Sequence, residues 1–352
     1  MREIFFLDWG NRDALTQLAA LRATNDIVHC IPIGINLTTT IKECAAMSVT
    51  DYFWVISSLT DYSNFDFTWH PDQYTAQYSQ VLGHSTWLLQ RDTINQLSAS
   101  LTDIHDIPDK HFVNLTNIQP IASPLDIVYI SNGEPKSELN WQHLLAATRG
   151  YPNRIVRIKD ITGRTAAYQA AAMASNTAWF FAVFAKLEIN PSFDWYWQPD
   201  VMHGAKHWIF TAKNPVNDLE YGHMAMILYN KFLTLDTVDS GLDFVMSRPC
   251  MLSPVSSGIA RFNQNPITTW RTAFREVLKL RRLADIQPTP ESNYRLNTWL
   301  TKAEGSFAAE CLCGAANAME YYDSINGDYE LLKLSFDWKW LDSYYEKNAR
   351  IQ

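Results

Sequence analysis

Three polar segments of the sequence carry side chains that could bind a phosphorylated ligand. A short loop of Asn132, Gly133 and Glu134 follows directly on an apolar run. Asp160 can accept a hydrogen bond from a base or a ribose. Arg164 begins an Ala-rich segment, where a helix N-terminus and a guanidinium would face the same anion. Each pattern also fits an ordinary strand-to-helix turn with capping. The set predicted to bind a nucleoside diphosphate is Asn132, Gly133, Glu134, Asp160, Arg164, Lys186 and Lys213.

Candidate general bases follow further along the chain, beside aromatic residues. Residues 206–215 and 220–224 place imidazoles and lysines next to aromatic rings. Sugar and nucleobase sites commonly combine an aromatic platform with a few polar groups. A base that deprotonates an acceptor hydroxyl would be an Asp, Glu or His, although any one of these side chains could instead be structural. The candidates are Glu188, Asp243, His207 and His223.

A basic stripe is predicted on a helix over residues 268–284. Arg271, Arg275, Lys279 and Arg282 are four, four and three residues apart, which places them on one helix face, opposite apolar residues. The surrounding residues, from position 256 to 303, include eight Lys/Arg and three Asp/Glu in a chain of net charge −8. Such a stripe could bind the phosphates of a polyanion. The alternative is a solvated helix face.

An internal repeat at a spacing of about 127 residues organises the elements that must position these side chains. Residues 45–55 read AAMSVTDYFWV, and residues 65–72 read FDFTWHPD. Their counterparts are AAMASNTAWFFAV at 171–183 and FDWYWQPD at 193–200. A repeat of this size indicates two copies of one domain and argues against a solenoid.

Each copy has the order strand, helix, strand, Ala-rich helix, strand. This order predicts βαβ units, an α/β fold and a parallel sheet. Ligands bind beyond the carboxyl ends of the strands in such sheets, so the loops after positions 130, 158 and 184 should form the site. In the second copy the five elements are expected at 126–130, 140–148, 154–158, 163–174 and 179–184.

The domain organisation follows from the repeat. We expect a degenerate first GT-A/Rossmann-like copy at 1–120, a second copy with the donor site at 121–255, and a helical region at 256–352. Residues 104–125 are read as the connection between copies. Donor binding is assigned to the second copy because the first has residues 36–38 (NLT) and 57–58 (SS) where the second has its arginine and lysine.

Composition excludes several classes of protein. A chain of 352 residues that is 47% hydrophobic is neither disordered nor fibrous. The net charge of −8 gives no chain-wide attraction to nucleic acid or to an anionic membrane. Five cysteines are too few for a disulfide scaffold and indicate reduced thiols in the cytoplasm. The first apolar run meets Asp8 after four residues, as a strand would, and no run approaches the roughly 20 apolar residues of a membrane span.

The second copy resembles the nucleotide-sugar half of GT-A glycosyltransferases. In those enzymes an Ala-rich helix with Gly and Arg precedes an apolar strand that ends in a metal-binding Asp-x-Asp pair. Phe184 and Lys186 stand at the place of that pair in this sequence. An Asp pair holds a cation that neutralises the donor diphosphate, whereas a lysine supplies positive charge directly. The resemblance therefore implies a metal-independent enzyme, unless Lys186 is only a solvated charge at a strand end.

Five phrases of the sequence resemble a glycosyltransferase family of tailed, T-even-like phages. Some members decorate phage DNA, and the resemblance includes those that transfer arabinose to 5-hydroxymethylcytosine. It implies a UDP- or CMP-linked sugar donor, no other cofactor, and an acceptor base that is reached in the groove of duplex DNA or flipped out of it, in the host cytoplasm. The alternative is a non-catalytic virion or host-interaction protein that keeps the fold. The phrases are FDFTWHP (65–71), ISNGEP (130–135), WFFAVFAKLE (179–188), KNPVNDLEYGHMA (213–225) and TWRTAFRE (269–276).

Overall fold

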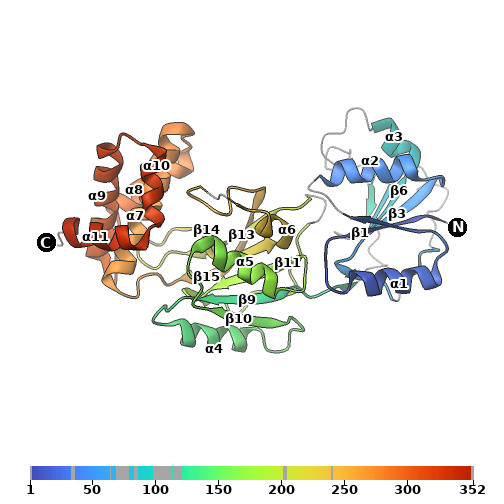
Figure 1. Cartoon of the computed structure of the whole chain (residues 1–352), viewed down its shortest axis with the longest axis horizontal. Coiled ribbons are helices and arrows are strands. Elements are labelled where there is room, and N and C mark those ends of the chain that lie inside the picture. Colours follow the sequence, from blue (N-terminus) through green and yellow to red (C-terminus); the bar gives the residue numbers. More distant parts are fainter. Residues whose placement is uncertain are drawn as a thin grey trace.

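The chain forms three parts that follow one another in space as they do in sequence (Figure 1). Two parts are mixed α/β and the third is helical, with the N-terminus and the C-terminus at opposite ends of the molecule. Much of the expected connection between the α/β parts, at 104–111 and 115–120, lies outside the described residues. The computed structural model describes residues 2–32, 36–63, 65–68, 79–82, 86–97, 112–114, 121–200, 204–238 and 241–349.

The first part is built on a mixed sheet. Strand β1, next to the edge strand β2, is parallel to β2 and β3, whereas β6 is antiparallel to β3. Helices α1 and α2 cover opposite faces, because Leu18 of α1 packs with Phe6 and Ile41 of α2 packs with Phe5. The strand order is β2 (Val28–Pro32), β1 (Ile4–Asp8), β3 (Tyr52–Ser57), β6 (Thr86–Gln90), β5 (Ser79–Leu82) and β7 (Phe112–Asn114). The other elements are α1 (Ala14–Thr24), α2 (Leu37–Met47), α3 (Arg91–Leu97) and the pair β4 (Thr60–Asp61) and β8 (Ile121–Ala122).

The second part has a larger mixed sheet. Strand β9 is parallel to β10 and β11, as predicted. The rest of the sheet was not predicted, since β14 is antiparallel to both β11 and β13, and a short loop between β13 and β14 permits only that direction. The strand order is β10 (Ile155–Lys159), β9 (Asp126–Ser131), β11 (Trp179–Phe184), β14 (Glu220–Asn230), β13 (His207–Lys213), β15 (Cys250–Ala260) and β12 (Leu187–Ile189). Its helices are α4 (Ser137–Ala147), α5 (Arg164–Ala174) and α6 (Lys231–Leu235).

The two sheets share the same arrangement of their first elements. The order β2-β1-β3-β6-β5 matches β10-β9-β11-β14-β13. Helices α2 and α5 each span 11 residues, and strands β3 and β11 each span 6. The segments predicted to be equivalent are 53–56 and 180–183. The first lies in β3, between β1 and β6, and the second lies in β11, between β9 and β14, so the two occupy matching places in their sheets.

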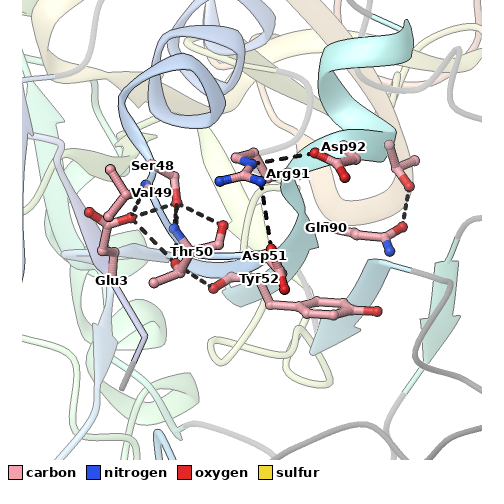
Figure 2. Close-up of polar contacts among 10 residues, drawn as sticks. Glu3, Ser48, Val49, Thr50, Asp51, Tyr52, Gln90, Arg91 and Asp92 are labelled. Carbon is pink, nitrogen blue, oxygen red and sulfur yellow. Dashed lines mark hydrogen bonds and ion pairs between the residues drawn. The ribbon is translucent and has the colours of Figure 1, made fainter.

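A hydrogen-bond network of polar side chains and backbone groups lies before β3 in the first part (Figure 2). Glu3 accepts hydrogen bonds from the Ser48 hydroxyl at 2.6 Å and from the Val49 N–H at 2.8 Å. The Thr50 hydroxyl donates to the carbonyl of Tyr52 at 2.8 Å, and the Thr50 N–H donates to Ser48 Oγ at 3.3 Å. The network fixes the turn between α2 and β3 to the start of β1.

The second part has the same network before β11. Asp126 accepts a hydrogen bond from the Asn176 N–H at 2.6 Å. The Thr177 hydroxyl donates to the carbonyl of Trp179 at 2.6 Å, and the Thr177 N–H donates to Ser175 Oγ at 3.1 Å. The serines and the threonines of the two networks are each 127 positions apart.

The first two parts meet through the loop after β1. The Asn11 side chain donates to the carbonyl of Ser58 at 2.7 Å and accepts from the N–H of Ala178 at 2.8 Å. Trp9 packs on Trp179, with ring centroids 4.7 Å apart. The carboxyl ends of β1 and β3 are thus covered by the residues that begin β11.

Helices form the third part, as predicted, but they begin at Pro266. Residues 256–260, which were predicted to belong to the helical region, instead end strand β15 of the second sheet. Asn265 caps α7 by accepting from the Thr268 N–H, and Pro266 occupies its first turn. Gly314 of α9 lets this helix approach α7, because a Cβ there would lie 2.3 Å from the Trp270 carbonyl oxygen. No helix in the described part of the chain has the length and apolar character of a membrane span. The elements are α7 (Pro266–Ile286), α8 (Pro290–Thr301), α9 (Ala308–Ser324), α10 (Tyr329–Leu332), the 3₁₀ helix η4 (Lys333–Phe336) and α11 (Trp338–Asn348).

Candidate functional site

Four basic side chains gather where β11 ends, and we call them the cationic cluster. Two come from the second α/β part and two come from α7 of the helical part, so neither part forms the cluster alone. Each of the four interacts with another member or with a shared neighbour through charge or a ring contact. The cationic cluster consists of Arg164, Lys186, Arg275 and Lys279.

Lys186 lies two residues beyond the end of β11 and is half-buried. The pKa of Lys186 is lowered to about 8, mainly by burial and also by the positive charges of Arg275 and Lys279, whereas the charges of Glu276 and Glu134 raise it. Among the described residues no carboxylate lies within ion-pair distance of its ammonium group. A cation buried without a direct counter-ion favours an anionic ligand.

Arg164 and Arg275 share one aromatic ring. Their guanidinium carbons lie 4.1 Å and 4.4 Å from the ring centroid of Phe336. Arg164 also donates to the carbonyls of Gly241 at 2.8 Å and Leu242 at 3.2 Å. Burial, and next the charge of Arg164, lower the pKa of Arg275 to about 10, and its buried Nε has no hydrogen-bond partner. Two like charges are held together here mainly by carbonyl and ring contacts.

Two carboxylates border the cationic cluster. Glu276 binds Lys279 at 2.6 Å, and Asp243 lies 3.7 Å from the same ammonium. Glu276 also lies 4.0 Å from Arg295. Asp243 was a predicted base and does lie beside the cluster, whereas Glu276 was missed. The one available signal was its position directly after Arg275, inside the phrase TWRTAFRE.

The predicted polar loops shape the same end of the sheet. The Asn132 N–H donates to Glu134 at 2.7 Å, and the Asn132 side chain accepts from the Ile161 N–H at 3.2 Å. Gly133 has a φ of 86°, and the exposed Asp160 has a φ of 56°, which is unusual for a residue with a side chain. These bonds tie the loop after β9 to the loop after β10.

The other predicted bases and the predicted donor lysine lie elsewhere. His207 is fully buried at the start of β13, its Nδ1 accepts from the Asn230 N–H, and burial lowers its pKa to about 3. It is therefore inaccessible to a substrate, contrary to the prediction. Glu188 is ion-paired to Arg261 at 2.7 Å, and exposed Lys213 pairs with Asp218 at 3.1 Å. The side chain of His223 lies outside the described residues.

The predicted basic stripe is not an open row of solvated charges. Arg271 binds Asp342 at 2.5 Å and packs on Trp338 at 3.9 Å. Arg282 packs on Tyr329 at 4.6 Å. Arg275 and Lys279 belong to the cationic cluster. The sequence placed all four on one helix face but carried no sign that the C-terminal segment covers it.

The described residues of the first α/β part place no cation at the two positions that match Arg164 and Lys186. Leu37 begins α2 where Arg164 begins α5, and Leu59 stands two residues after β3 where Lys186 stands after β11. Both leucines are 3% exposed and belong to one apolar core. These two positions of the first part therefore offer an anion no positive charge.

Comparison with known proteins gives little independent evidence for the function of this site. No known protein family matches the chain, and no curated relative does. One solved structure, the mannosyltransferase PcManGT from Pyrobaculum calidifontis in complex with GDP-Man and Mn2+, is similar over 64% of this chain and 88% of that one. The identity is 11% and the TM-score is 0.33, which establishes neither a family nor an activity for this chain. Within the described residues, no three His, Cys, Asp or Glu side chains form a group that could hold a metal ion.

Proposed function

We propose that the protein is a glycosyltransferase that binds the diphosphate of a nucleotide sugar at the cationic cluster. The observation that carries the proposal is a half-buried Lys186 with no ion-pair partner among the described residues, beside Arg164 and Arg275 at the carboxyl end of the parallel strands. A diphosphate would supply the negative charge that this site lacks. The leaving diphosphate gains charge as the sugar bond breaks, so the same cations would stabilise the transition state.

The polar loops and carboxylates supply the remaining functions in this proposal. Asp160 is exposed in the loop between β10 and α5, four residues before Arg164, and would accept a hydrogen bond from the base or ribose of the donor. Asp243 is the best placed of the predicted bases for an acceptor hydroxyl, because it lies 3.7 Å from the Lys279 ammonium at the border of the cluster. Since the cluster supplies positive charge directly, we propose transfer without a metal ion.

The acceptor in this proposal is hydroxymethylated cytosine in phage DNA, with arabinose as the sugar, in the host cytoplasm. This part rests only on the resemblance of five sequence phrases to phage glycosyltransferases. The covered stripe on α7 offers DNA no ready surface, so a DNA acceptor would have to contact other residues. A non-catalytic nucleotide-binding protein of the virion is the second candidate.

We further propose that the two α/β parts, residues 1–120 and 121–255, arose by duplication. The shared strand order and the two Ser-x-Thr networks, 127 positions apart, support this. In the first copy, leucines replace the two cations and the strand ends pack against the second copy. The first copy would then be structural.

Calorimetric titration of UDP, CMP, GDP and pyrophosphate in EDTA tests the binding site. We expect at least one nucleoside diphosphate and pyrophosphate to bind. Lys186→Met should weaken both by about 10- to 100-fold, because a charged hydrogen bond contributes roughly 1.5–3 kcal/mol. Lys302→Met is the matched control, since the Lys302 side chain is 43% exposed and pairs with Asp218 at 3.2 Å.

Transfer itself is tested by mass spectrometry of hydroxymethylated DNA incubated with the protein and candidate nucleotide sugars. A mass gain of one sugar residue supports the enzyme. Binding of the nucleotide without transfer to DNA or to small hydroxyl acceptors favours the non-catalytic candidate. If neither nucleotides nor pyrophosphate bind the wild-type protein, the donor site is wrong.

A further inference from the structure

The C-terminal segment places aromatic rings on the basic residues of α7. Tyr329 contacts Arg282, Phe336 contacts Arg275, and Trp338 contacts Arg271. The segment could be a lid over a cationic surface or a fixed wall of the site. Its anchoring distinguishes these two interpretations.

The segment that carries Phe336 is anchored on both sides. Leu332 and Leu341 are 0% and 1% exposed and belong to the apolar core of the helical part. Asp337 caps α11 by accepting from the N–H groups of Lys339 and Trp340. Opening the segment as a lid would expose these leucines, so Phe336 is part of a fixed wall.

Phe336 differs from the other two rings because both cations that it contacts, Arg164 and Arg275, belong to the cationic cluster. Arg271 also has Asp342 as a carboxylate partner, whereas Arg275 has no carboxylate partner among the described residues and its Nε has no hydrogen bond. Arg164 and Arg275 repel each other, and the electron-rich face of Phe336 is a shared contact that offsets part of this repulsion without consuming N–H donors.

We infer that Phe336 is a positioning residue for the diphosphate site. Its ring lies over the guanidinium carbons of Arg164 and Arg275, and it thereby offsets their repulsion without placing in the site an acceptor that would compete with phosphate oxygens. A carboxylate in the same place would hold the arginines equally well but would compete with the phosphate. This inference rests on the proposed function, because it assumes that the cluster binds a diphosphate.

Titration with pyrophosphate, which requires no knowledge of the nucleotide, tests the role of the ring. We expect Phe336→Ala and Phe336→Leu to weaken pyrophosphate binding about tenfold or more, and Phe336→Tyr to stay within about threefold of the wild type. Leucine keeps apolar bulk but has no aromatic face, so its loss of affinity would report the ring contact rather than packing. Thermal melting confirms that each variant is folded.

Trp338→Ala is the matched control, because it removes a ring of the same segment from an arginine outside the cluster. Its pyrophosphate affinity should stay within about threefold of the wild type. The inference is overturned if Phe336→Leu binds as the wild type does, or if Trp338→Ala loses as much affinity. Failure of the wild type to bind pyrophosphate and nucleoside diphosphates would overturn the proposed function and this inference together. Equal binding by all variants would overturn the inference alone.

Discussion

At the scale of single residues, Lys186 shows how position changes the chemistry of a common side chain. Lysines are usually solvated, with a pKa near 10.4. Here Lys186 follows the end of β11 and is half-buried beside Arg275 and Lys279, and the pKa of its ammonium group is lowered to about 8. The side chain is still protonated at neutral pH, so it can bind an anion, but only a small rise in pH removes its charge.

This shift predicts the pH dependence of binding. Relative to Lys186→Met, which reports the titration of pyrophosphate itself, the affinity of the wild type should fall as the pH rises through 8, because only protonated Lys186 attracts the anion. Titrations between pH 6.5 and 9.5 would measure this, with Lys186→Met as the control that loses the step. An unchanged wild-type affinity across this range would contradict the role of Lys186.

The lowered pKa of Lys186 also determines how its contribution to the free energy of unfolding changes with pH. Between pH 8 and about 10.5 the unfolded chain keeps a proton on Lys186 that the ligand-free folded chain has released. The contribution of Lys186 to the free energy of unfolding therefore rises over this interval. Below pH 8 the lysine is charged in both states, and the cost of burying its charge is fully present.

Sequence reasoning located residues near strand ends and helix starts, although their role in donor binding stays a proposal. Arg164 was chosen at the start of an Ala-rich helix and Lys186 at the end of an apolar strand, and the structure brings both to one cluster. His207 was misplaced because a histidine between aromatic residues looks the same in a site and in a core. Phe336 was missed, since nothing local marks a phenylalanine that contacts two distant arginines.

At the scale of elements, local pattern located the helices and strands of the second part to within a few residues. Strand β11 has the predicted bounds, and α7 extends the prediction of 268–284 by two residues at each end. The antiparallel half of the sheet was missed because β13 and β14 mix polar and aromatic side chains, which suggested a ligand site rather than strands. Docking of α10, η4 and α11 on α7 is a tertiary contact without a local sequence signal.

This docking predicts how α7 responds to loss of a charge. Arg271→Ala should lower the free energy of unfolding by about 1–2 kcal/mol, because it removes a half-buried ion pair with Asp342 and a ring contact with Trp338. A solvated position would change it by about 0.5 kcal/mol or less, and exposed Lys339→Ala is that control. Urea denaturation measures both variants.

The behaviour of Arg271→Ala also tests whether the basic stripe binds DNA. If Arg271 is structural, its removal should leave the salt dependence of binding to duplex DNA unchanged. A decrease of about one in the salt slope at unchanged stability would instead make Arg271 a phosphate contact. The covered stripe would then have to open when DNA binds.

At the scale of the whole molecule, the site depends on how the three parts are joined. The second part supplies Arg164 and Lys186, the helical part supplies Arg275 and Lys279, and the first part packs its strand ends against β11. The loop that would receive a ligand in the first part is therefore used as an interface. This use gives the first part a structural role that does not require the cations.

The interface predicts a large effect from one buried amide. Asn11 is 7% exposed, and its side chain bonds to the Ser58 carbonyl and the Ala178 N–H, so Asn11→Ala leaves both backbone groups without these partners. The free energy of unfolding should fall by about 2 kcal/mol or more. Exposed Gln142→Ala, which removes a 3.4 Å bond to Glu138, should change it by less than about 0.5 kcal/mol.

Denaturation followed by tryptophan fluorescence measures the loss, because Trp9 and Trp179 pack at this interface. Pyrophosphate affinity at low denaturant should stay unchanged, since the cluster lies at the opposite end of β11. Wild-type stability in Asn11→Ala would show that the first part contributes nothing to the fold of the second, and a loss of pyrophosphate binding would place the first part in the function of the site.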